Sequence, residues 1–311
     1  MKIGIIGPGA LGCLFASRLF LAVATAEQHK VLLIDHNASR ADRLNCSGII
    51  YETEDSRQHL NIPVNSCPED VGILDVLFSC VKSYDIEESL RFAAPLTATS
   101  TLLVFLQNGI SHLNYSQMPL SATPVFATSS EGATLLAPGH VKHAGRGQTY
   151  LGFYDSGAQQ HNSHLYQVLA LLQKGGISSS VSSDICSRIW AKLLINVGIN
   201  ALTAIHNRSN GFLLTSPGIL TELKALVLEA TRVAEAMGIT IREDPVQATI
   251  SVCKNTAANI SSMLQDVRAG RATEIDAING AVTMLGRKLG IATPYNDAIV
   301  ARIRSIQEHY Q

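Results

Sequence analysis

The segment Lys2–Gly12, KIGIIGPGALG, decides the fold of this chain. Residues 2–6 are mostly apolar and predict a short buried strand, and a glycine-rich turn then leads into an apolar helix. In such a unit the first glycine allows the tight turn, the second lets the backbone approach a pyrophosphate, and the third lets helix pack on strand. With phosphate at the helix N-terminus, the predicted cofactor contacts are Gly7, Pro8, Gly9, Ala10, Leu11 and Gly12.

A second apolar segment supports this interpretation. Residues 31–34 predict another buried strand, which ends at Asp35, about 20 residues after the glycine turn. An acidic side chain at that point of a dinucleotide-binding fold accepts hydrogen bonds from the ribose hydroxyls. Asp35 is therefore a further candidate cofactor contact.

Two more buried strands are predicted at residues 76–81 and 102–106. Lys82 follows the first, and Gln107, Asn108 and Gly109 follow the second. Ligands of parallel sheets bind beyond the carboxyl ends of the strands, so Lys82 and Asn108 are predicted to contact the cofactor. The alternative for each is a solvated loop residue.

The rest of the first half predicts a further strand at residues 125–128 and a hairpin. The hairpin joins residues 140–144 to 149–153 around Gly145–Gly147, and we expect it to close the edge of the sheet. A helix at residues 163–174, stopped by Gly175 and Gly176, completes the domain. We predict an α/β class, with a Rossmann-like dinucleotide-binding domain at residues 1–183.

From residue 184 to 311 the pattern predicts an all-helical domain. Helices are expected at residues 219–237, from Pro245 after the cap Asp244, and at 259–267, and a similar apolar face continues over residues 275–285. Ser262 and Glu274 stand opposite that apolar face.

The helix predicted within Arg188–Gly211, RIWAKLLINVGINALTAIHNRSNG, carries a polar stripe on an otherwise apolar surface. Lys192, Asn196 and Asn200 follow one another at four-residue spacing and lie on one face. One positive charge and two carboxamides suit a small anionic or carbonyl-bearing ligand. The alternative is that both asparagines are satisfied inside the core and that the lysine extends to solvent.

Composition narrows the class of protein. With 311 residues, 46% of them hydrophobic, the chain can bury a core and form two domains. A net charge of −1 without a basic run excludes nucleic acid and an anionic membrane surface as expected partners. The six cysteines are scattered, so we expect reduced thiols, no metal site and a cytoplasmic location. The N-terminal segment resembles a signal peptide, but Arg18 interrupts its apolar run.

Five segments together resemble the ketopantoate reductase (2-dehydropantoate 2-reductase) family over residues 1–289. They are GPGALG, Val81-Lys82, Gln107-Asn108-Gly109, KLLINVGINALTAI and NISSMLQDVRAGRATEIDAING. The resemblance implies a dinucleotide-binding domain followed by a helical domain, with the active site in the cleft between them. It also implies reduction of 2-oxopantoate to pantoate with a nicotinamide cofactor, a step of pantothenate biosynthesis.

The resemblance further implies roles for individual residues. Lys192 matches the catalytic lysine, which also contacts the substrate. The other residues that match substrate contacts are Asn108, Asn196, Asn200, Asn210, Ser262 and Glu274. Lys82 and Asn108 match cleft residues of the first domain, Glu274 matches an acid near both cofactor and substrate hydroxyl, and Ala133 matches a backbone cofactor contact.

The chemistry of a 2-oxo acid reduction agrees with these residues. Negative charge develops on the carbonyl oxygen and must meet a cation or an acid, for which Lys192 is the candidate. Burial against Trp190 and Leu194 would lower the lysine pKa from its ordinary value. Glu274 can accept a hydrogen bond from a substrate hydroxyl. Two alternatives stay open: a β-hydroxyacid dehydrogenase acting on another small oxo acid, and a dinucleotide sensor without turnover.

The expected cofactor rests on two opposing observations. Members of the family mostly use NADPH and have a basic residue after the second strand, whereas this chain has Asp35, which favours NADH. Arg40 or Arg43, a turn or two later, could offset the repulsion of a 2′-phosphate. We expect NADPH, with NADH tolerated, in a protein that is a monomer or a homodimer.

Overall fold

The computed structural model describes residues 1–24, 28–117, 121–154 and 162–310. It divides into two compact units: residues 1–107 with 112–185, and residues 108–111 with 186–311. The boundary expected from the sequence, between residues 183 and 184, stays a proposal.

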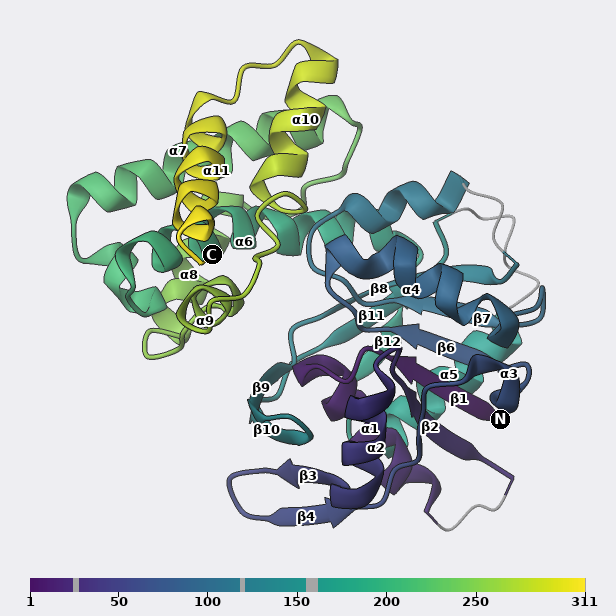
Figure 1. The fold of residues 1–311 in the computed structure, drawn as a ribbon. Coiled ribbons are helices and arrows are strands. Elements are labelled where there is room, and N and C mark those ends of the chain that lie inside the picture. The colour runs from purple at the N-terminus through teal and green to yellow at the C-terminus, as the bar shows by residue number, and fades with distance from the viewer. Residues whose placement is uncertain (25–27, 118–120, 155–161, 311) are drawn as a thin grey trace. The chain divides into compact units, whose positions relative to one another are not determined.

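The first unit contains a large, mainly parallel sheet (Figure 1). In spatial order its strands are β12 (Ser179–Val181), β11 (Thr149–Gly152), β8 (Thr123–Ser129), β7 (Leu102–Phe105), β6 (Val76–Ser79), β1 (Lys2–Ile6), β2 (Lys30–Ile34) and β5 (Val64–Asn65). The five pairings from β5 to β8 are parallel, while β11 is antiparallel to β8 and parallel to the edge strand β12. The predicted α/β class with a Rossmann-like sheet is confirmed.

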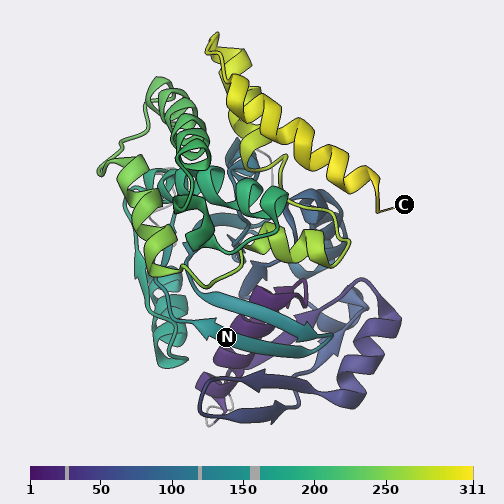
Figure 2. The ribbon, with the colours of Figure 1, turned by 90° about the vertical axis from the view of Figure 1, so that its left-hand side faces the viewer.

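A smaller sheet lies on the other side of helix α1 (Ala10–Val23), as Figure 2 shows. Its strands are β4 (Arg57–Leu60), β3 (Ile49–Glu52), β10 (His140–Gly145) and β9 (Gly132–Ala137). Because α1 contacts strands of both sheets, residues 12–17 are buried on every face. This burial explains why the first half of the helix is apolar on every side. The glycine turn that precedes the helix lies next to this buried half.

The remaining helices of this unit cover the large sheet or connect its strands. They are α2 (Ala38–Ser47), α3 (Pro68–Val71), α4 (Ile86–Ala93) and α5 (Asn162–Lys174), with 3-10 turns η1 (Ser83–Asp85), η2 (Ala94–Leu96) and η3 (Ser111–Gln117).

The predicted hairpin of residues 140–144 and 149–153 is wrong. Strand β10 pairs with β9 and β3 in the small sheet, whereas β11 pairs with β8 and β12 in the large one. The true hairpin turn lies before β10, where Gly139 has a φ of 76° between β9 and β10. Residues 145–147 instead carry the chain from the small sheet to the large one. Strands β10 and β11 therefore do not form a pair that closes the edge of the large sheet.

The second unit is helical, as predicted (Figure 1). Asp244 caps α8 through bonds from Val246 and Gln247, and proline occupies the first helical position, as the sequence predicts. The elements of this unit are α6 (Ile185–His206), the 3-10 turn η5 (Asn210–Leu214), α7 (Pro217–Ala236), α8 (Pro245–Asn255), α9 (Ser262–Arg268), α10 (Asn279–Leu289) and α11 (Pro294–Glu308).

The region around Glu274 differs from the predicted helical face. Helix α10 begins only at Asn279, and Glu274–Ile278 forms a turn in which the N–H groups of Ala277 and Ile278 both donate to the carbonyl of Glu274, at 3.1 Å. Glu274 is 5% exposed rather than on a polar outer face. In the described part of the chain, one helix, α6, is long and apolar enough to span a membrane, but 67% of its apolar window is buried within the protein.

Candidate functional site

The glycine turn has the geometry expected of a pyrophosphate cradle. Gly7 has a φ of 94°, which favours glycine, and a Cβ at Gly12 would lie 2.1 Å from the Gly7 carbonyl oxygen. A Cβ at Gly9, the residue that caps α1, would meet no atom within 4 Å. The first N–H groups of a helix lack acceptors within the helix. The open space beside them therefore suits a phosphate group of a dinucleotide.

Asp35 follows strand β2 as predicted, but its carboxylate is already engaged. The side chain is fully buried, and Arg40 donates to both oxygens, through Nε to Oδ2 and through Nη2 to Oδ1 at 2.6 Å. The backbone N–H of Asn37 donates to Oδ1 at 3.0 Å. The hydrogen bond that Arg40 donates to Asp35 raises the pKa of Arg40. The group presented to solvent here is the guanidinium of Arg40, whose side chain is 38% exposed.

Lys82 and Ala133, the other candidates of the first unit, are both partly buried. Lys82 precedes the 3-10 turn η1 after β6, at the carboxyl end of the parallel strands. Ala133 lies in β9 opposite His143 of β10. Their proposed cofactor contacts rest on these positions.

Helix α6 of the second unit carries the predicted lysine. Lys192 is partly buried. Desolvation lowers its pKa from 10.5 to about 8, while the charge of Glu274 acts in the opposite direction. A lysine with this pKa exchanges its proton near neutral pH, which an ordinary lysine does poorly. The burial effect expected from the sequence is confirmed.

Glu274 contacts the segment Asn108–Ser111. The amide Nδ2 of Asn108 donates to Oε2 of Glu274 at 3.0 Å, and the N–H of Ile110 donates to the Ala277 carbonyl at 3.3 Å. A Cβ at Gly109, where φ is 79°, would lie 2.1 Å from that same carbonyl oxygen. The segment therefore docks directly on the Glu274 turn. The carboxamide of Asn108 is bonded to the carboxylate of Glu274, and the charge of that carboxylate acts on Lys192.

The remaining candidates occupy different environments. Asn196 is partly buried and Asn200 is 5% exposed, both on α6. Asn210 is buried at the start of η5, where its Nδ2 donates to Oγ1 of Thr256 at 2.8 Å and its Oδ1 has no protein partner among the described residues. Ser262, the first residue of α9, is exposed.

Sequence reasoning missed the role of Ser261. This serine is buried and caps α9 by accepting from the N–H of Leu264 at 3.1 Å. It also accepts from the hydroxyl of Thr203 on α6 at 2.7 Å. The pair Ser261-Ser262 carries a helix-start signal, but either serine could occupy the cap.

A glycine turn with open space beside it in one unit, and a lysine of lowered pKa in the other, are features expected of a dinucleotide-dependent oxidoreductase. The family models described as "Ketopantoate reductase PanE/ApbA" and "Ketopantoate reductase PanE/ApbA C terminal" match residues 3–156 and 184–307. The chain is 32% identical to the 2-dehydropantoate 2-reductase of Halobacterium salinarum over 99% of both chains. It belongs to the ketopantoate reductase family.

Solved structures agree. A PanE/ApbA family ketopantoate reductase from Ralstonia eutropha has a TM-score of 0.89 at 29% identity, covering all of both chains. A D-mandelate dehydrogenase in a ternary structure with NADH and anilino(oxo)acetate also has a TM-score of 0.89, at 25% identity, covering 100% of this chain and 99% of that one.

Proposed function

We propose that this protein is a 2-dehydropantoate 2-reductase, which reduces 2-oxopantoate to pantoate with a nicotinamide cofactor. The observation that carries the proposal is the group formed by Lys192, Glu274 and Asn108. The pKa of the lysine is lowered, the charge of the buried Glu274 carboxylate acts on it, and Asn108 donates to that carboxylate. Membership of the family and 32% identity to a named 2-dehydropantoate 2-reductase support it.

The residues of the second unit divide the chemical work. The nicotinamide, when bound, supplies the hydride that reaches the carbonyl carbon. Lys192 holds a proton at Nζ and gives it to the carbonyl oxygen as negative charge develops there. Asn196 and Asn200 orient the 2-oxo acid with neutral donors, together with Asn210 and Ser262. Glu274 accepts a hydrogen bond from the substrate hydroxyl.

A second reaction is favoured by one comparison. The D-mandelate dehydrogenase matches this fold as well as the ketopantoate reductase does, so another small 2-oxo acid is the alternative substrate. A β-hydroxyacid dehydrogenase and a sensor without turnover are the remaining alternatives. Assays of cofactor oxidation with 2-oxopantoate, its deoxy analogue and 2-oxo-2-phenylacetate separate them, because only the proposed function gives the highest kcat/KM with 2-oxopantoate.

For the cofactor we propose NADPH, and the Asp35–Arg40 pair supports this choice. An Asp35 that faced the ribose would repel a 2′-phosphate, but its carboxylate is buried and neutralised by Arg40. A guanidinium has five N–H donors, and Asp35 takes only two of them. Arg40 therefore keeps donors for a phosphate, and the N-terminus of α2 adds a favourable dipole.

Replacing Arg40 tests this assignment. We expect Arg40→Ala to lower kcat/KM for NADPH about 10-fold to 100-fold, since a hydrogen bond to a charged group contributes roughly 1.5–3 kcal/mol. The value for NADH should stay constant or rise, because the freed Asp35 can accept from the ribose hydroxyls. Arg43→Ala, which removes an exposed arginine of the same helix, is the matched control. An unchanged NADPH/NADH ratio in Arg40→Ala would contradict the assignment.

Replacing Glu274 tests both of its proposed roles. We expect Glu274→Gln to lower the pKa of Lys192 further, so that activity declines at a lower pH than in the wild type. Discrimination between 2-oxopantoate and its deoxy analogue should fall about 10-fold to 100-fold with loss of the charged acceptor. Glu222→Gln, whose carboxylate pairs with Arg302 instead, is the control. A normal pH profile and an unchanged specificity ratio would remove Glu274 from the site.

We also propose that the enzyme acts in the cytoplasm as a monomer or a homodimer, with no nucleic acid, membrane or metal ion among its partners. The scattered cysteines and the near-neutral charge support this proposal.

A further inference from the structure

One buried carboxamide links the lysine helix to the glutamate turn. Nδ2 of Asn279, a residue with no exposed surface, donates to the carbonyl oxygen of Val197 on α6 at 3.2 Å. The same nitrogen donates to Oδ1 of Asn296 on α11 at 3.0 Å. Asn279 is thus a bridge between α10, where it is the first residue, and two other helices.

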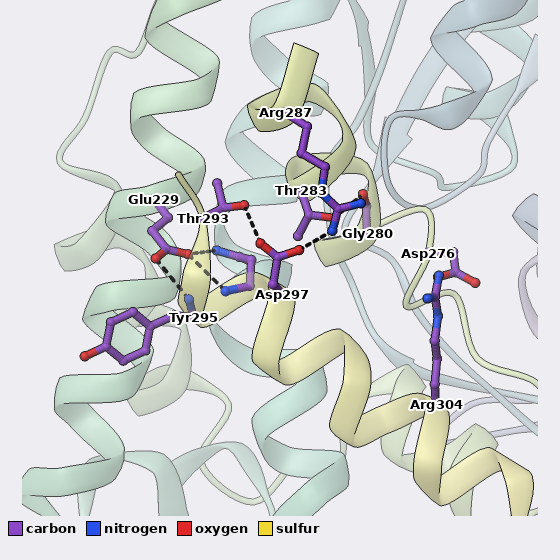
Figure 3. Close-up of polar contacts among 10 residues, drawn as sticks. Glu229, Asp276, Gly280, Thr283, Arg287, Thr293, Tyr295, Asp297 and Arg304 are labelled. Carbon is purple, nitrogen blue, oxygen red and sulfur yellow. Dashed lines mark hydrogen bonds and ion pairs between the residues drawn. The ribbon is translucent and has the colours of Figure 1, made fainter. Parts of the chain in front are cut away.

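Asn296, which accepts one bond from Asn279, is itself held by contacts with α7. Asn296 donates through its backbone N–H and through Nδ2 to Oε2 of Glu229 on α7, both at 2.9 Å, and through Nδ2 to the carbonyl of Leu226 at 3.1 Å. The other oxygen of Glu229 accepts from the N–H of Tyr295 at 3.0 Å, so that this carboxylate caps α11 (Figure 3). Asn296 thus ties α11 to α7 through contacts that are separate from the one Asn279 makes with α6.

Both ends of the bridge lie next to residues of the proposed reaction. Val197 immediately follows Asn196, and it comes five residues after Lys192 on the same helix. Asn279 immediately follows the Glu274–Ile278 turn. Gly198 follows Val197 on α6, and a Cβ added there would lie 2.8 Å from Val227 on α7, so α6 has little room to move at this point.

The amide of Asn279 carries a cost as well as two bonds. Its Oδ1 is buried without a hydrogen-bond partner among the described residues, which is unfavourable. The Val197 carbonyl belongs to a helix whose own hydrogen bonds already supply it with a donor. An apolar side chain of the same size would remove the unpaired oxygen and leave the Val197 carbonyl paired, but Oδ1 of Asn296 would lose its bond from Asn279. What the amide adds toward α6 is therefore a directed contact rather than a needed hydrogen-bond partner.

We propose that Asn279 is a positioning residue, which acts through Val197 to hold the Lys192 helix in a fixed position relative to Glu274. The inference rests on the proposed reductase function. Without the bridge, α6 and the turn can separate, so the lysine and the glutamate lose their alignment. Misplacement of a reacting group by about 1 Å can cost as much as 100-fold in rate.

The test compares Asn279→Leu with Glu229→Gln, a change in the same network that leaves the Asn279–Val197 contact in place. We expect Asn279→Leu to lower kcat about 10-fold or more with the KM for the cofactor unchanged. Its activity should decline at a lower pH, because Glu274 then raises the lysine pKa less. Glu229→Gln should lower the melting temperature but keep kcat and the pH profile. If Asn279→Leu does not fold, Asn279→Ala replaces it.

A readout independent of turnover separates this inference from the reductase proposal. Trp190 is the only tryptophan of the chain and lies on α6, buried, two residues before Lys192. We expect its emission and acrylamide quenching to change in Asn279→Leu and not in Glu229→Gln. Unchanged fluorescence together with unchanged kcat, or losses of kcat that follow melting temperature in both variants, would overturn the inference. A wild type inactive on 2-oxopantoate would instead contradict the reductase proposal, and the fluorescence comparison would still stand.

Discussion

Lys192→Ala is expected to lower turnover about 10²-fold to 10⁴-fold, the range that a positioned general acid contributes. In the proposed reaction the lysine provides both a proton and a positive charge for the developing oxyanion. Binding of the dinucleotide should stay close to normal, because the glycine turn belongs to the other unit. Stopped-flow measurement of hydride transfer and titration with the reduced cofactor check the two parts separately.

Lys192→Arg is the control, since it keeps the charge but is effectively always protonated and so transfers no proton. We expect its KM for the 2-oxo acid to stay near that of the wild type while kcat remains low. In the wild type, kcat should decline as the pH rises through about 8, where the lysine loses its proton. A Lys192→Ala enzyme that retained more than about a third of the turnover would show that another group is the acid.

Gly9→Ala is expected to raise the KM for the cofactor about 10-fold to 100-fold without loss of stability. The added methyl group meets no protein atom within 4 Å, so the protein folds normally. The methyl group would instead occupy the space proposed for the pyrophosphate, which costs one or more charge-assisted hydrogen bonds of roughly 1.5–3 kcal/mol. Cofactor titration by fluorescence and thermal unfolding of the free protein give the two quantities.

Gly12→Ala provides the contrast. Its methyl group would lie 2.1 Å from the Gly7 carbonyl oxygen, so we expect a loss of about 1–3 kcal/mol or more in the free energy of unfolding. The pair separates close approach to a ligand from packing of helix on strand. Equal stability losses in both variants, or normal cofactor binding by Gly9→Ala, would contradict the proposed cradle.

Local sequence signals predicted much of the fold. The strand and glycine turn of Lys2–Gly12, the buried helix around Lys192 and the cap at Asp244 depend on neighbouring residues, so periodicity and turn chemistry were enough to find them. The burial of Lys192, which lowers its pKa, followed from the apolar residues that surround it on the helix.

Contacts between distant segments were beyond such signals. The alternation of apolar and polar residues identifies a strand but not the strand with which it pairs. Residues 140–144 and 149–153 are therefore predicted as one hairpin although they belong to different sheets. The ion pair of Asp35 with Arg40 depends on a rotamer, and Glu274 lies in a turn that the segment Asn108–Ser111 contacts from far away in the sequence. The tertiary environment, rather than the residue type, determines what these side chains offer.

Reduction of 2-oxopantoate by this protein can be measured directly by comparing kcat/KM for three substrates with NADPH. The substrates are 2-oxopantoate, its deoxy analogue and 2-oxo-2-phenylacetate, each followed by the loss of cofactor absorbance. We expect the highest value for 2-oxopantoate and a preference over the deoxy analogue of about 10-fold or more, because Glu274 accepts a hydrogen bond from the substrate hydroxyl in the proposed complex. A higher value for 2-oxo-2-phenylacetate, or no oxidation of the cofactor with any of the three, would contradict it.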